Sequence, residues 1–183
     1  MSSKEEHMLE ALELAKRGSL TASPNPMVGC VITHKNQVIG RGWHERSGEN
    51  HAEINAIEDV FSNLGNKSKE ALKESELFVN LEPCTTFGKT PPCADSINEY
   101  GIRKVYFGNE DKAQKGFSKM HPEIKVESGL LEKEGRKLNR GFFSRIEKGR
   151  PYITCKVASA LDGGIALPSG ESKWITSSDS RKD

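Results

Sequence analysis

The chain has 183 residues, of which 34% are hydrophobic, and its 27 basic and 26 acidic side chains leave a formal net charge of +1. This length suits one full domain with a short addition, and the hydrophobic content suffices for a packed core. The near-zero charge excludes a global attraction to nucleic acid or to an anionic membrane. No apolar run can cross a bilayer and the polar N-terminus is unlike a secretory signal, so we expect a cytoplasmic protein.

The apolar pattern predicts helices that alternate with strands along the chain. Helices are expected at 5–17, 51–64, 93–100 and 130–147. Strands are expected at 27–33, 37–43, 76–81, 104–108 and 124–126. The polar stretches 65–75 and 109–122 are expected to be an exposed segment and a loop. Such alternation is typical of a layered α/β domain.

The character of the sequence changes near residue 149. A new strand is expected over 151–158, and a Gly/Ser-rich run follows it. A lone strand of this kind cannot bury itself. We therefore expect one domain over 1–149 and the incomplete beginning of another over 150–183. Cys30 and Cys155 lie in strand-like apolar runs and are expected to be small buried side chains.

Three residues stand out as potential metal ligands: His51, Cys84 and Cys93. In a cytoplasmic chain, cysteines are thiols or metal ligands rather than disulfides. One imidazole and two thiolates leave a fourth position on zinc for water, as in catalytic sites. Cys93 begins a predicted helix, whose dipole favours a thiolate. We therefore expect Zn²⁺ as the cofactor, one ion per chain.

Glu53 lies two residues after His51, in the first turn of a predicted helix. Zinc lowers the pKa of water toward about 7, and a neighbouring carboxylate can move the released proton to a leaving amine. Zinc-dependent nucleobase deaminases carry H-x-E followed by P-C-x-x-C. Here eight residues, not two, separate Cys84 from Cys93. By itself, the pattern also fits a core histidine and two unrelated thiols.

Four sequence runs bring the chain closer to one family. They are residues 24–32 (PNPMVGCVI), 40–44 (GRGWH), 48–56 (GENHAEINA) and 81–93 (LEPCTTFGKTPPC). Together they resemble the deaminase domain of the bifunctional riboflavin-biosynthesis deaminase/reductase, which has the same longer spacing between its cysteines. Residues 156–163 (KVASALDG) and 169–177 (SGESKWITS) are similar to the opening of that family's reductase domain.

The resemblance implies a fold, a reaction and roles for four residues. The fold is a cytidine-deaminase-like three-layer α/β/α sandwich with a mixed central sheet. The reaction is hydrolytic deamination of 2,5-diamino-6-(5-phosphoribosylamino)pyrimidin-4-one to 5-amino-6-(5-phosphoribosylamino)uracil, with release of ammonia. In this reaction His51, Cys84 and Cys93 would hold zinc. Glu53 would carry the protons.

The resemblance also implies substrate contacts at Asn25, His44, Lys89 and Asp111. Lys89 matches a basic position suited to the substrate's phosphate, because a point charge suits a dianion. Two departures from the family affect this part of the site. Thr86 stands where the family often has His, and residues 111–114 read Asp-Lys-Ala-Gln where the family has Asp-Pro-Asn-Pro.

Three functions stay open at this point. The chain is the riboflavin-pathway deaminase, a deaminase of the same fold for another base, nucleoside or tRNA adenosine, or a non-catalytic zinc subunit of a separate reductase. A tRNA editor is expected to have a basic, aromatic-rich surface, which a net charge of +1 and 7% aromatic residues disfavour. The presence of Glu53 favours catalysis.

The expected ligand is a small phosphoribosylaminopyrimidine, with no nucleic-acid and no membrane partner. A homo-oligomer and a separate reductase chain are the open protein partners. Reductase activity is not expected from this chain, because NADPH is needed only where a complete reductase domain is present.

Overall fold

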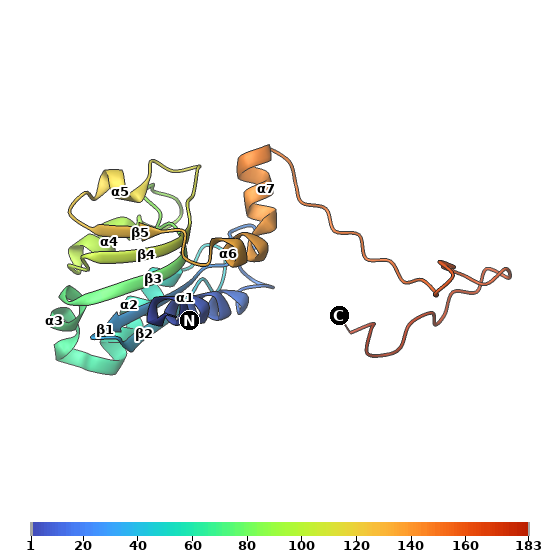
Figure 1. Cartoon of the computed structure of the whole chain (residues 1–183), viewed down its shortest axis with the longest axis horizontal. Helices are drawn as coiled ribbons and strands as arrows, with labels where there is room; N and C mark the ends of the chain where they lie inside the picture. The colour runs from blue at the N-terminus through green and yellow to red at the C-terminus, as the bar shows by residue number, and fades with distance from the viewer. Residues whose placement is uncertain (1, 183) are drawn as a thin grey trace. The chain divides into compact units, whose positions relative to one another are not determined.

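The computed structural model describes residues 2–182, which divide into two units between Pro151 and Tyr152. The first unit is an α/β domain (Figure 1). Its strands are β1 (Gly29–His34), β2 (Gln37–Trp43), β3 (Ser75–Leu81), β4 (Lys104–Asn109) and β5 (Lys125–Ser128). Its α-helices are α1 (Ser3–Lys16), α2 (Ala52–Leu64), α3 (Ser68–Lys73), α4 (Cys93–Glu99), α5 (Phe117–Met120), α6 (Glu132–Leu138) and α7 (Arg140–Lys148), and a 3-10 turn spans Gly65–Lys67.

The five strands form one mixed sheet in the order β2-β1-β3-β4-β5. β1 is antiparallel to β2 and β3, whereas β4 is parallel to β3 and β5. Successive side chains of a strand point to opposite faces. Val31 and Phe78 accordingly pack with α1 on one face, and Ile32 and Val79 pack with α2 and α4 on the other. This arrangement confirms the predicted α/β sandwich with a mixed sheet.

Two segments differ from the sequence-based expectation because each contains a short helix. Residues 65–75 are not simply exposed, since α3 buries Leu72 completely. The loop expected over 109–122 contains α5, whose Phe117 is fully buried. An isolated apolar side chain in a polar stretch gives no periodic signal, so the pattern did not reveal these helices.

The helix expected over 130–147 is two helices, α6 and α7, which are divided at Asn139. The buried Asn139 carboxamide accepts a hydrogen bond from the Met27 N–H and donates one to the Met27 carbonyl, both at 2.8 Å. Asn80 from β3 donates to the same carbonyl at 3.0 Å and accepts from the Gly29 N–H at 2.8 Å. These two asparagines therefore fix the segment that leads from Asn25 into β1.

The second unit contains no helix or strand in its described residues, Tyr152 to Lys182. The strand expected over 151–158 is therefore wrong for this part of the chain, and Cys155 is exposed rather than buried. A strand needs a neighbour that pairs with its backbone groups, and this unit supplies none within the same residues. The expectation for Cys30 is confirmed, since it is buried in β1. Among residues 2–182, no helix has the length and apolarity needed to span a membrane.

Helix α2 packs so closely on β2 that position 42 has no room for a side chain. A Cβ on Gly42 would lie 2.3 Å from the Ala52 carbonyl oxygen and 2.3 Å from the Ala56 amide nitrogen. We expect Gly42→Ala to displace α2 and to lower the free energy of unfolding by about 1–3 kcal/mol, measured by denaturant unfolding.

Gly141→Ala is the matched control for Gly42→Ala. Gly141 lies in α7, and a Cβ there would meet no atom of the described residues within 4 Å beyond its own stretch of helix. The gain in helix propensity is expected to stabilise this variant by up to about 1 kcal/mol. Wild-type stability of the Gly42→Ala variant would contradict the packing argument.

Candidate active site

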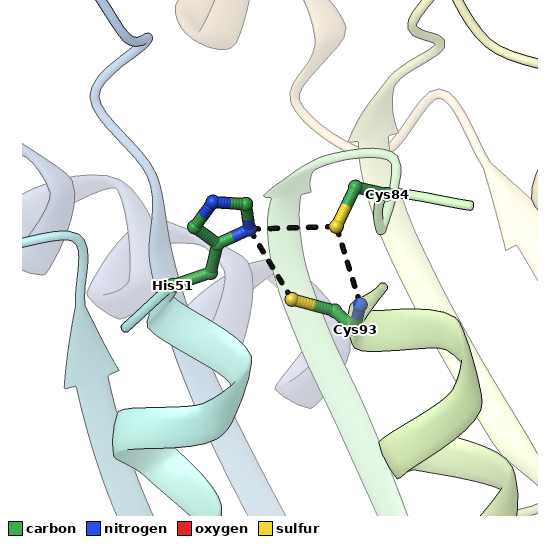
Figure 2. Close-up of side chains that lie close together, drawn as sticks. All are labelled: His51, Cys84 and Cys93. Atoms are coloured by element: carbon green, nitrogen blue, oxygen red, sulfur yellow. Dashed lines mark hydrogen bonds between the residues drawn. The ribbon is translucent and has the colours of Figure 1, made fainter. Parts of the chain in front are cut away.

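The three predicted metal ligands come together at one end of the sheet, although they lie far apart in the sequence. His51 stands at the N-cap of α2, Cys84 follows β3, and Cys93 is the first residue of α4. Figure 2 shows the three side chains pointing toward one another. Their ligand atoms all lie within 4.8 Å of one another.

The distances and the donor set fit a zinc ion. His51 Nδ1 lies 3.4 Å from Cys84 Sγ and 3.3 Å from Cys93 Sγ. Tetrahedral zinc, with bonds of roughly 2.0 Å to nitrogen and 2.3 Å to sulfur, places such ligand atoms about 3.6 Å apart. One imidazole with two thiolates is a common zinc ligand set. The group is therefore suited to hold Zn²⁺ without a rearrangement of the backbone.

The two thiols are electrostatically coupled. The pKa of Cys84 is lowered to about 4, chiefly because the Cys93 thiol hydrogen-bonds to it and further because of His51. The Cys93 backbone N–H also donates to Cys84 Sγ, at 3.2 Å. The same thiol hydrogen bond, together with burial, raises the pKa of Cys93. The opposite shifts favour a thiolate at Cys84 and a thiol at Cys93, whose proton metal binding would release.

Glu53 lies in the first turn of α2 and is only 3% exposed. Burial raises the pKa of this carboxyl group to about 7, and the negative charge of Cys84 contributes in the same direction. Glu53 lines the same cavity as His51 and Cys84. Its carboxyl group is therefore able to take up or release a proton near neutral pH, beside the candidate metal ligands and shielded from bulk water.

A cavity of about 330 Å³ adjoins the metal-ligand group. Its walls include all four residues that the resemblance assigned to substrate, namely Asn25, His44, Lys89 and Asp111, and also Thr86. The structure therefore brings these residues together around one space. The volume lies at the lower end of the range for small-molecule sites.

His44 is held as a neutral imidazole by its surroundings. Burial lowers its pKa. Its Nδ1 donates to the Asn50 carbonyl oxygen at 3.0 Å, so its Nε2 accepts from Asn25 Nδ2, also at 3.0 Å. The ring lies edge-on to His51, with 5.3 Å between the ring centroids. His44 therefore orients an amide in the cavity wall and packs against the candidate metal ligand His51.

Gln114 is a residue of this site that the sequence reasoning did not assign. Both carboxylate oxygens of Asp111 are occupied within the loop, by the Ala113 N–H at 3.0 Å and by Gln114 Nε2 at 2.9 Å. The Gln114 side-chain oxygen, Oε1, accepts a hydrogen bond from the Thr85 N–H at 2.6 Å. Gln114 thus ties the Asp111 loop to the residue after Cys84. The departure from the family at this position was the only sequence signal.

Glu82 fixes the same loop from the other side. Its buried carboxylate accepts hydrogen bonds from the backbone N–H of Asp111 at 2.9 Å and from that of Phe117 at 2.6 Å. Because Glu82 also lies two residues before Cys84, it links the loop after β4 to the metal ligands.

We expect Glu82→Gln to lower the free energy of unfolding by about 1–3 kcal/mol, because an amide leaves one buried N–H without an acceptor. Denaturant unfolding of the zinc-loaded protein measures this loss. Glu76→Gln, on β3, the strand that leads into Glu82, is the control. It removes an ion pair between Glu76 and Lys104, 2.7 Å apart and partly exposed, and should cost less than about 1 kcal/mol. Equal losses in the two variants would argue against the role of Glu82.

The sequence matches a known family and several relatives. The pattern of the cytidine and deoxycytidylate deaminase zinc-binding region matches residues 1–109. Riboflavin biosynthesis protein RibD of Buchnera aphidicola (subspecies Baizongia pistaciae) is 44% identical over 183 residues, which cover 97% of this chain and 47% of that protein. A diaminohydroxyphosphoribosylamino-pyrimidine deaminase of Buchnera aphidicola (subspecies Schizaphis graminum) is 43% identical over 150 residues, covering 79% of this chain and 97% of that protein.

A solved structure is similar to this chain in both sequence and fold. The diaminohydroxyphosphoribosylaminopyrimidine deaminase/5-amino-6-(5-phosphoribosylamino)uracil reductase of Thermotoga maritima is 40% identical, with a TM-score of 0.89, and the match covers 98% of this chain and 51% of that one. The chain thus spans about half the length of the RibD relatives it matches. The match over residues 1–109 includes the metal-ligand group and Glu53. The chain therefore belongs to the cytidine and deoxycytidylate deaminase zinc-binding family, among relatives that are riboflavin-biosynthesis deaminases.

Proposed function

We propose that this chain is a zinc-dependent deaminase that converts 2,5-diamino-6-(5-phosphoribosylamino)pyrimidin-4-one into 5-amino-6-(5-phosphoribosylamino)uracil and ammonia. The observation that carries the proposal is the group of His51, Cys84 and Cys93 next to the buried Glu53, in the wall of a cavity sized for a small molecule. The relative that is named for this deaminase alone, and that matches over 97% of its own length, supports the choice of substrate.

The chemistry divides between the metal and the residues of the chain. His51, Cys84 and Cys93 would hold Zn²⁺, which would supply a Lewis acid that makes water a nucleophile near neutral pH. Glu53 accepts one proton from the attacking water and delivers it to the ring nitrogen, and it then accepts the proton of the added hydroxyl group and delivers it to the leaving amine. Because its carboxyl group is buried, these transfers are separated from bulk solvent.

The cavity wall holds the substrate in the orientation that this proton transfer requires. Asn25 and His44, which are hydrogen-bonded to each other, contact the pyrimidine ring. Lys89 contacts the phosphate. Asp111 contributes by holding its loop in the conformation that shapes the cavity wall. Its carboxylate oxygens already accept two hydrogen bonds from within this loop.

We assign residues 1–149 to the deaminase domain and residues 150–183 to the beginning of a reductase domain. The similarity of 156–163 and 169–177 to the family's reductase opening supports this division. NADPH would serve only a complete reductase domain. The proposed setting is the cytoplasm, and the proposed protein partners are a second copy of the chain or a separate reductase chain.

Ammonia release by the purified, zinc-loaded chain tests the proposal. We expect turnover of the diaminopyrimidinone phosphoribosylamine and no turnover of cytosine or adenosine. Turnover of cytosine or adenosine alone would favour a deaminase of the same fold with another substrate. A zinc-loaded chain that releases no ammonia from any of the three would favour a non-catalytic zinc subunit.

A further inference from the structure

The cavity wall contains charged side chains of both signs, which differ in whether they have a partner within the protein. The acidic ones are Glu49, Glu53, Glu82 and Asp111, and the basic ones are Lys89 and Arg145. Glu82 and Asp111 use their carboxylate oxygens for hydrogen bonds within the protein. Glu49 lies 3.7 Å from Arg46, and Glu53 lies beside the metal ligands. Each acidic side chain of the wall therefore interacts with a group other than the two basic side chains of the wall.

The two basic side chains of the wall differ from the acidic ones, because neither has an ion-pair partner among the described residues. Among residues 2–182, neither Lys89 nor Arg145 forms an ion pair. The one acidic residue of α7, Glu147, pairs instead with Arg136 and with Lys112. Within the described residues, the cavity wall thus carries two positive charges that have no carboxylate at ion-pair distance.

The two cations come from separate elements that face the same space. Phe142 and Arg145 both line the cavity, and residues three apart share one face of a helix, so this face of α7 forms part of the wall. Lys89 lies in the segment between β3 and α4, and its side chain covers Gly48. A Cβ on Gly48 would lie 3.6 Å from Lys89 Cδ and 3.9 Å from Lys89 Nζ.

We propose that Arg145 acts with Lys89 as an anion subsite for a phosphomonoester. A phosphate dianion balances two cations, and a guanidinium can donate two parallel hydrogen bonds to phosphate oxygens. This inference rests on the proposed function, whose substrate carries a ribose phosphate. It adds a residue of α7 that lies beyond the 1–109 segment matched by the family pattern.

Calorimetric titration of the zinc-loaded chain with ribose 5-phosphate tests the subsite without turnover. We expect Arg145→Gln to weaken binding about tenfold or more, and Arg145→Lys to restore part of the loss. Lys148→Gln is the control, because Lys148 is on the same helix but does not line the cavity. Equal affinities of Arg145→Gln and wild type, or no binding of ribose 5-phosphate by wild type, would overturn the subsite.

Kinetics with two substrates separates recognition of phosphate from a structural role. We expect Arg145→Gln to reduce kcat/KM about tenfold or more for the phosphorylated diaminopyrimidinone and to leave it unchanged for the dephosphorylated compound. An equal reduction for both compounds would overturn the proposal. If wild type binds ribose 5-phosphate but releases no ammonia, the subsite stands and the proposed function fails.

Discussion

The Glu53→Gln variant is expected to bind zinc as wild type does and to release ammonia roughly 10²–10⁴-fold more slowly. Glutamine has nearly the same shape as glutamate but cannot accept the proton of the attacking water. Because the side chain is buried beside Cys84 and Cys93, no solvent carboxylate can replace it. Metal analysis and an ammonia assay on the same preparation measure the two quantities.

Glu58→Gln is the matched control for this experiment. Glu58 lies on the same helix and is exposed, and its carboxylate accepts a hydrogen bond from Asn50 Nδ2 that a glutamine can also accept. Turnover of this variant should stay within about twofold of wild type. Wild-type turnover in Glu53→Gln would remove Glu53 from the mechanism, and loss of zinc would show that it supports the metal site instead.

The Cys84→Ser variant is expected to lose zinc and to melt roughly 10 °C lower than the zinc-loaded wild type. A serine hydroxyl is not ionised at neutral pH and is a poor zinc ligand, so the stabilisation from bound metal is lost. A metal present at about 1,000 times its dissociation constant contributes about 4 kcal/mol, and each kcal/mol shifts the melting temperature by roughly 2–4 °C at this chain length.

Cys155→Ser controls for the loss of a thiol as such. Cys155 is exposed and lies outside the metal-ligand group, so this variant should keep its zinc and its melting temperature. Metal analysis after dialysis, with a thermal melt in saturating zinc, measures both variants. Full zinc occupancy in Cys84→Ser would refute the ligand assignment.

The main helices and strands were predictable because their apolar side chains repeat with a regular period. In α2, for example, Ala56, Ile57 and Val60 recur on one buried face. The division between α6 and α7 was not predictable, because it depends on the hydrogen bonds of Asn139 with a residue 112 positions away in the chain. Short helices such as α5, which buries Phe117, contain too few apolar side chains to give a helical period, so the sequence pattern did not predict them.

The site shows the same contrast. His51, Glu53, Cys84 and Cys93 lie at the ends of elements, within sequence runs that resemble one deaminase family, and this resemblance marked them as candidates. Gln114 and Arg145 line the cavity through long-range placement of a loop and of the last helix. No local pattern marks Arg145, and a departure from the family was the only sequence signal at Gln114, so the three-dimensional arrangement is what places both residues in the site.

The residues of the cavity wall fall into two groups, one positioned by helices and a strand of the core and the other by loops. Glu53 and the metal ligands are anchored by α2, β3 and α4, which pack in the central core, whereas Lys89 and Gln114 lie on loops. For directed evolution, this division means that a library can vary the loop positions while the proposed metal ligands and Glu53 stay in place. Selection for a new substrate would then leave the proposed catalytic group unchanged.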